Sequence, residues 1–250
     1  MSCNSSAAVL YFAPMDSSLL AAIARPFDAG PTGLDLHAPD GFLTVPVALA
    51  MWAVTVVVLA LAVARANRSL DERAIPLMGV LAAFIFAAQM FNFPVIGGTS
   101  GHLLGAVLAA VLLGPWVGTI VMASVVAVQA LLFQDGGLVI MGANIFNMGI
   151  VGTLGGYALY RGLCRVLGGE DRGRLPAAGI AAWASVVAGA VAMALQLGAS
   201  GVVPIGVTLP AMVGVHVLIG IGEALITMAA LAFIGVTRAD LFRLRDAQPV

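Results

Sequence analysis

Lysine is absent from this chain of 250 residues, so all eleven basic residues are arginines. A Walker A phosphate-binding loop requires a lysine, and the chain therefore contains no such ATP site. Charged residues make up only 9% of the sequence, whereas ordinary soluble domains contain about 25%. With a formal net charge of −1 as well, nothing in the composition favours binding of nucleic acid. The only cysteines, Cys3 and Cys164, form no CxxC pair and suggest no disulfide framework.

Hydrophobic residues, by contrast, account for 61% of the chain, and the mean hydropathy is +1.07. An apolar helix needs roughly 20 residues to cross about 30 Å of hydrocarbon. The sequence predicts an all-α polytopic membrane protein with about seven transmembrane helices. The expected spans are residues 44–64, 75–93, 102–114, 116–133, 138–160, 177–198 and 209–236. The third span is short, and the Gly114-Pro115-Trp116 corner after it fits either a tight turn between helices or an interruption in one long helix.

The arginines predict the orientation of the bundle, because short cytoplasmic loops are enriched in basic residues. They cluster after the first, fifth and seventh expected spans. Seven spans, with the N-terminus outside and the C-terminus inside, place ten of the eleven arginines in the cytosol. We therefore expect a multi-pass protein of the cytoplasmic membrane with a transmembrane bundle over 44–236 and a cytoplasmic tail over 237–250.

Residues 1–35 form a separate N-terminal extension. Their apolar runs are too short to span a membrane, and they contain several prolines and glycines. No basic residue precedes Arg25, whereas a secretory signal begins with a positive region. We expect this extension to be disordered or removed.

Two of the three histidines lie on the predicted outer side of the membrane. His37 belongs to the segment 36–43, and His102 follows the loop 93–101. Imidazole suits Zn, Cu, Ni and Co ions. The pair therefore suggests a metal-capture site; ordinary interfacial histidines, the commoner case near a membrane surface, are the alternative, and residue types alone do not settle the choice. Asp40 is placed either to cap the helix that Pro46 begins or to hold the His37 ring.

Several polar residues are expected deeper in the bundle, where an unsatisfied polar group costs several kcal/mol. Asn144 and His216 fall at such depths and are expected to face the bundle interior, where His216 is either a satisfied interior histidine or a third ligand. Glu223 lies near the middle of the last span. An intramembrane acid is a candidate functional residue, with hydrogen-bonded packing as the alternative.

Ser100 raises a different possibility, an intramembrane hydrolase in which it acts with His102 or His216. The stretch Gly98-Thr99-Ser100-Gly101-His102 departs from the G-x-S-x-G form, because His102 stands in place of the last glycine. A third interpretation is a stand-alone metal channel or secondary carrier.

Five longer motifs carry a family resemblance: HAPDGFL, FNFPVIGGTSGHLLG, LLGPWVG, QALLFQDGGLVIMGANIFNM and GVHVLIGIGEALIT. Over roughly residues 36–236 the chain resembles the substrate-capture membrane component of energy-coupling-factor cobalt and nickel transporters, the CbiM/NikM family. The resemblance implies uptake of Co(II) or Ni(II) as the substrate. It also implies as partners two cytosolic ATPase subunits, a transmembrane coupling protein and often a small accessory membrane protein.

The resemblance further implies a near-planar set of four nitrogens around the ion. In this sequence they would be the amine of Leu36, the backbone nitrogen and imidazole of His37, and the imidazole of His102. Such a plane favours Ni(II)-like geometry over tetrahedral Zn(II). Because 35 residues precede Leu36, a free amine there requires either removal of a leader or a true start at Leu36; otherwise Asp35, Asp40 or water would replace the amine. We predict that the mature N-terminus lies at or very near Leu36. Mass spectrometry of the protein from its native host tests this expectation.

Overall fold

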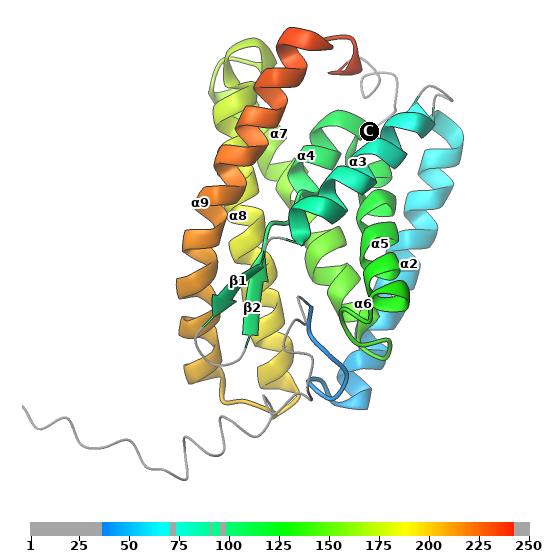
Figure 1. Cartoon of the computed structure of the whole chain (residues 1–250), viewed down its shortest axis with the longest axis vertical. Coiled ribbons are helices and arrows are strands. Elements are labelled where there is room, and N and C mark those ends of the chain that lie inside the picture. Colours follow the sequence, from blue (N-terminus) through cyan, green and yellow to red (C-terminus); the bar gives the residue numbers. More distant parts are fainter. Residues whose placement is uncertain (1–36, 71–73, 91, 96–98, 243–250) are drawn as a thin grey trace, which may run out of the picture.

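The computed structural model describes residues 37–70, 74–90, 92–95 and 99–242. Figure 1 shows a bundle of helices that run mostly along the long axis of the molecule. The elements are α2 (Val45–Ser69), α3 (Ala74–Gln89), β1 (Asn92–Val95), β2 (Thr99–His102), α4 (Ala106–Leu113), α5 (Pro115–Leu132), α6 (Met141–Asn144), the π-helix η2 (Ile145–Gly155), α7 (Gly156–Val166), α8 (Glu170–Ala199) and α9 (Ile205–Thr237). The expected N-terminal extension 1–35, Leu36 and the end of the expected tail lie outside the described residues.

Four helices of the described part are long and apolar enough to cross a membrane: Val45–Arg68, Pro115–Leu132, Glu170–Ala199 and Ile205–Thr237. The shorter helix Ala74–Gln89 is also apolar. The fifth expected span corresponds to the helical run from α6 through η2 to α7. The chain is therefore a multi-pass membrane protein built of helices, while the count of seven spans and their orientation remain predictions.

The second and third expected spans need a correction. Residues 92–95 and 99–102 are not helical but pair as an antiparallel ribbon, in which Asn92 lies opposite His102 and Phe93 opposite Gly101. Pro94 lacks the N–H that a continuing helix requires and is tolerated in an edge strand. The described part is thus helical apart from this short two-stranded ribbon, in line with the all-α class.

The helix left in the third span, α4, has only eight residues and a length of roughly 12 Å. All eight of its side chains are buried, as expected for a helix that is apolar on every face. A Cβ atom on Gly118 of α5 would lie 3.0 Å from the nitrogen of Ala110, eight positions earlier. The chain therefore reverses at Gly114, which has a φ of +81°, and the corner is a tight turn between two antiparallel helices.

Polar contacts hold the central helices at fixed positions against one another. Asn147 of η2 and Gln196 of α8 exchange two side-chain hydrogen bonds, of 3.0 and 2.7 Å, in the buried interior. The Trp52 ring of α2 donates to Val139 O at 2.8 Å. A Cβ atom on Gly142 would lie 2.7 Å from that ring, so α2 and α6 approach each other closely.

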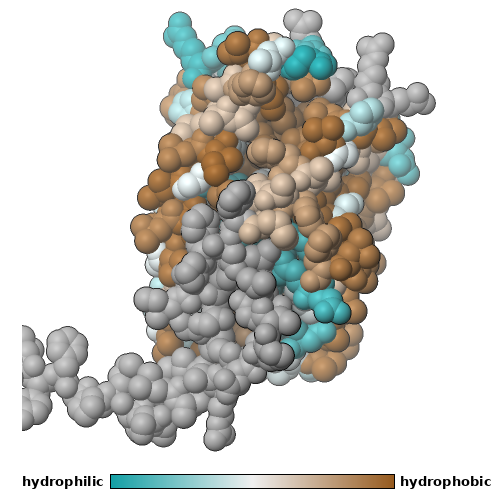
Figure 2. Space-filling model, in the orientation of Figure 1, coloured by the Kyte–Doolittle hydropathy of each residue, from teal (hydrophilic) through white to brown (hydrophobic). Residues whose placement is uncertain are grey.

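Different polar contacts join the elements at the two ends of the bundle. At one end, the N–H of Thr44, just before α2, donates to Ser200 Oγ of the α8–α9 connection at 3.1 Å. At the other, Arg161 pairs with Glu170 at 2.7 Å near the α7–α8 connection. Figure 1 places the start of α2 at the lower end and the end of α9 at the upper end. Figure 2 shows hydrophobic side chains over most of the visible flank, with hydrophilic ones at the upper end and in a patch toward the lower end.

Candidate metal-capture site

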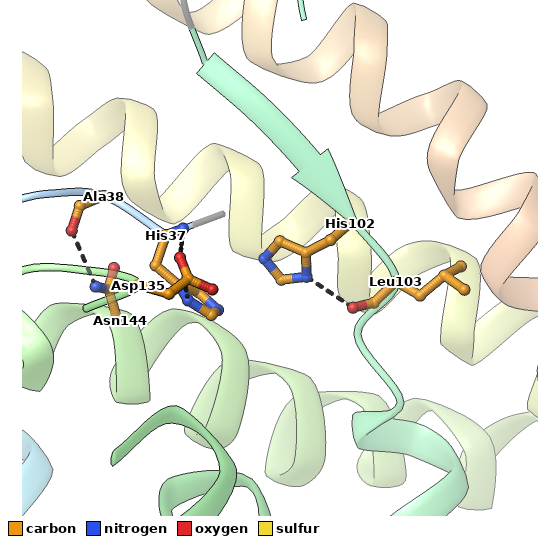
Figure 3. A network of polar contacts seen from close by, with 6 residues as sticks. All are labelled: His37, Ala38, His102, Leu103, Asp135 and Asn144. Carbon is orange, nitrogen blue, oxygen red and sulfur yellow. Dashed lines mark hydrogen bonds and ion pairs between the residues drawn. The ribbon is translucent and has the colours of Figure 1, made fainter. Parts of the chain in front are cut away.

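His37 lies buried against the loop that joins α5 to α6. Its backbone N–H donates to Asp135 Oδ1 at 3.0 Å, and its ring nitrogen Nδ1 lies 3.3 Å from the same oxygen. Asp135 is itself buried. Figure 3 shows the Asp135 carboxylate beside the backbone and ring of His37. The carboxylate therefore holds the residue by its main chain and its side chain together.

Further contacts join the segment that carries His37 to the loop between α5 and α6 and to α6. Ala38 O accepts from the N–H of Gly137 at 3.0 Å and from Asn144 Nδ2 at 3.1 Å. Gly136 has a φ of +96°, and a Cβ atom there would lie 2.8 Å from the Cβ atom of His37. Close packing of the two segments thus requires glycine at this position.

Asp40 has a different role from either one expected. The first turn of α2 has no side-chain cap, and the carboxylate near the His37 ring belongs to Asp135. Asp40 instead accepts hydrogen bonds from three consecutive backbone N–H groups just before α6, those of Leu138, Val139 and Ile140, at 3.1, 2.8 and 3.2 Å. The distance in sequence, about 100 residues, explains why a local capping rule pointed to the wrong helix.

His102 ends strand β2, and its ring centroid lies 4.8 Å from that of His37, with an angle of 69° between the planes. Its Nδ1 contacts Leu103 O at 2.7 Å. Since a carbonyl oxygen only accepts, Nδ1 carries the proton and Nε2 presents a lone pair. Burial, and then the neighbouring His37 ring, lower the pKa of His102 from 6.5 to about 3. The ring is therefore neutral near pH 7, the form that binds metal ions.

The His37 ring is buried; its Nδ1 is paired with Asp135 Oδ1 at 3.3 Å, and within the described residues its Nε2 has no hydrogen-bond partner. A buried polar atom without a partner costs about 1–3 kcal/mol. A cation shared with His102 would satisfy such a nitrogen. Among the described residues no three His, Cys, Asp or Glu side chains are grouped to hold an ion, so two imidazoles would need further ligands.

The remaining predicted residues relate to the pair in different ways. Glu223 contacts the chain just after His102, because its carboxylate accepts from the N–H groups of Leu104 and Gly105. Leu36 lies outside the described range, and Ser100 is placed only through its backbone pairing with Pro94. His216 donates from Nδ1 to Met212 O of its own helix at 2.7 Å, and it is close enough to His102 to interact with it electrostatically.

Two residues of this region had no role in the sequence analysis. Asp135 was given no part in the site. Its position between the apolar end of α5 and two glycines was the available signal, because a lone acid there needs a partner. Gln89, at the end of α3, donates from Nε2 to Leu104 O at 2.9 Å. No local pattern marks that contact.

Comparison with known proteins gives a consistent result. Residues 37–241 match the family model described as the cobalt uptake substrate-specific transmembrane region. A protein of Haloquadratum walsbyi that is named for metal transport is 42% identical over 208 residues, which are 82% of this chain and 93% of that protein. The fused nickel transport protein NikMN of Rhodobacter capsulatus is 33% identical over 226 residues, covering 85% of this chain and 65% of that protein.

A solved structure has the same fold. The crystal structure of a truncated transition metal transporter superposes with a TM-score of 0.74 at 34% sequence identity. The match covers 79% of this chain and 97% of that chain.

Proposed function

Because this chain belongs to the family of cobalt uptake substrate-specific transmembrane regions, we propose that it captures Co(II) or Ni(II) between His37 and His102 as the substrate-binding component of an energy-coupling-factor transporter. The observation that carries the proposal is the 4.8 Å separation of the two rings, which come from segments 65 positions apart. His102 adds a neutral ring with its proton on Nδ1, which leaves Nε2 for the ion.

The ligand types favour a late first-row divalent ion. Imidazole nitrogens suit Co, Ni, Cu and Zn, whereas Mg and Ca prefer oxygen ligands. If main-chain nitrogens complete a plane, Ni(II) is favoured over tetrahedral Zn(II). Because the ligands would be the same for both substrates, these residues do not distinguish Co(II) from Ni(II).

Energy for uptake would come from other subunits. The chain has no lysine and hence no Walker A site. The proposed partners are two cytosolic ATPase subunits, a transmembrane coupling protein and, in many such systems, a small accessory membrane protein. The arginine-bearing end of the bundle, which carries the Arg161–Glu170 ion pair, is the proposed cytosolic side.

The test is uptake of radiolabelled Ni(II) and Co(II) into vesicles that contain this chain with or without the ATPase and coupling subunits. We expect ATP-dependent uptake only with the complete set, and we expect the double variant His37→Ala/His102→Ala to remain at background. Equal uptake by the chain alone, independent of ATP, would identify a stand-alone channel or carrier instead. Uptake by the double variant at the wild-type rate would exclude the proposed capture site.

A further inference from the structure

Glu223 is a buried carboxylate near the middle of α9, with only 2% of its surface exposed. Both of its oxygens are used. The N–H of Leu104 donates to Oε2 at 2.8 Å, and the N–H of Gly105 donates to Oε1 at 2.7 Å. These two residues follow His102 by two and three positions. The carboxylate is therefore hydrogen-bonded to the backbone that connects β2 to α4.

The same short connection is held from the opposite side by α3. The fully buried Gln89 donates to Leu104 O at 2.9 Å. Gly105 has a φ of +75°, and a Cβ atom there would lie 2.7 Å from the Ile85 side chain. The connection is therefore fixed by hydrogen bonds to α9 and α3 and by close packing on α3.

The chemistry at Glu223 calls for a carboxylate in particular. Two N–H donors face it, and a carboxylate offers an acceptor oxygen to each. A glutamine in the same place would satisfy one donor and turn its own NH₂ toward the other. The free N–H groups at the start of α4, which carry the positive end of the helix dipole, also favour a negative group there.

We infer that Glu223 is a positioning residue for His102: it sets where the His102 ring stands relative to His37 and ties that ring to α9. The His102 ring is hydrogen-bonded to Leu103 O, and Leu103 directly precedes Leu104 and Gly105, the two residues bound by Glu223. A shift of this connection therefore moves the ring. α9 also packs against β2, the strand that ends at His102. The inference rests on the proposed metal capture by the two histidines.

The experiment compares Ni(II) binding by the full-length wild type and the Glu223→Gln variant in detergent, by calorimetric titration and by the ligand-field absorption of bound Ni(II). We expect the variant to bind Ni(II) about 10- to 100-fold more weakly, the range for losing a group that orients a ligand. We also expect an altered absorption spectrum, because the His102 nitrogen would approach the ion differently. A purely structural role would lower the thermal midpoint without changing the spectrum of bound Ni(II).

Thr227→Val is the matched control, because Thr227 is also 2% exposed and lies one turn further along α9. We expect it to keep wild-type affinity and spectrum. A monodisperse Glu223→Gln protein with both unchanged would overturn the inference. If that variant does not fold, Glu223→Asp is measured instead, and wild-type affinity and spectrum there would assign the carboxylate to folding alone. Unchanged Ni(II) binding by His37→Ala and His102→Ala would instead refute the proposed capture site.

Discussion

Replacing His102 with alanine is expected to weaken Ni(II) binding by more than about 100-fold. Loss of a group that only orients a metal ligand costs roughly 10- to 100-fold, and loss of a ligand should exceed that range. The variant should fold, because among the described residues the His102 ring is hydrogen-bonded to the adjacent Leu103 O and not to another helix. Calorimetric titration of the purified protein with Ni(II) and with Co(II) measures the effect, and metal analysis after size-exclusion chromatography checks it.

His216→Ala provides the matched control, since it removes the same side chain from a residue hydrogen-bonded within α9. We expect its Ni(II) affinity to stay within a few fold of wild type. An equal loss in both variants would make His216 a third ligand. Retention of wild-type Ni(II) affinity by His102→Ala would show that the ion is not held between the His37 and His102 rings.

The Gly137→Ala substitution is expected to displace the segment that carries His37. A Cβ atom at this position would overlap both the carboxylate and the main-chain nitrogen of Asp40. The overlap falls on Asp40, which accepts hydrogen bonds from three backbone N–H groups just before α6, and Gly137 itself donates to Ala38 O. Overpacking typically costs about 1–3 kcal/mol, and here it also moves His37. We expect a lower thermal midpoint in detergent and at least about tenfold weaker Ni(II) binding.

The control for this prediction is Gly79→Ala in α3. A Cβ atom there meets no atom within 4 Å, and alanine is about 1 kcal/mol more favourable than glycine inside a helix. Its midpoint should be equal or higher and its Ni(II) affinity unchanged. Wild-type stability and Ni(II) affinity in Gly137→Ala would mean that the segment with His37 and Asp40 can move away from the α5–α6 loop without effect on the site.

Sequence reasoning located the helices well where composition decides the structure. The long apolar runs that become α2, α5, α8 and α9 were expected within a few residues of their ends, apart from the start of α8. It failed where contacts between residues far apart in sequence determine the structure. The ribbon of β1 and β2 depends on pairing across a loop, and its two outer residues, Asn92 and His102, had been assigned to two expected helices.

The site shows the same division. Both histidines were proposed from their chemistry, from their place near the ends of apolar runs and from the family resemblance. Asp135, beside His37, is 98 positions away from it in sequence. Glu223 is 119 positions away from Leu104, whose N–H donates to it. Contacts at such separations leave no periodic signal in a single sequence. Asp135 therefore had no assigned role, and Glu223 was left between two interpretations.

The short central helix α4 has a consequence for how the protein is made. Roughly 12 Å of apolar helix cannot anchor itself across a bilayer, so α4 must enter together with α5 as a hairpin. The acceptors for the N–H groups of Leu104 and Gly105 belong to α9 and are synthesised 119 and 118 residues later, respectively. Completion of this interior therefore waits for the synthesis of α9, and a chain arrested before Glu223 would leave those two N–H groups without their acceptors.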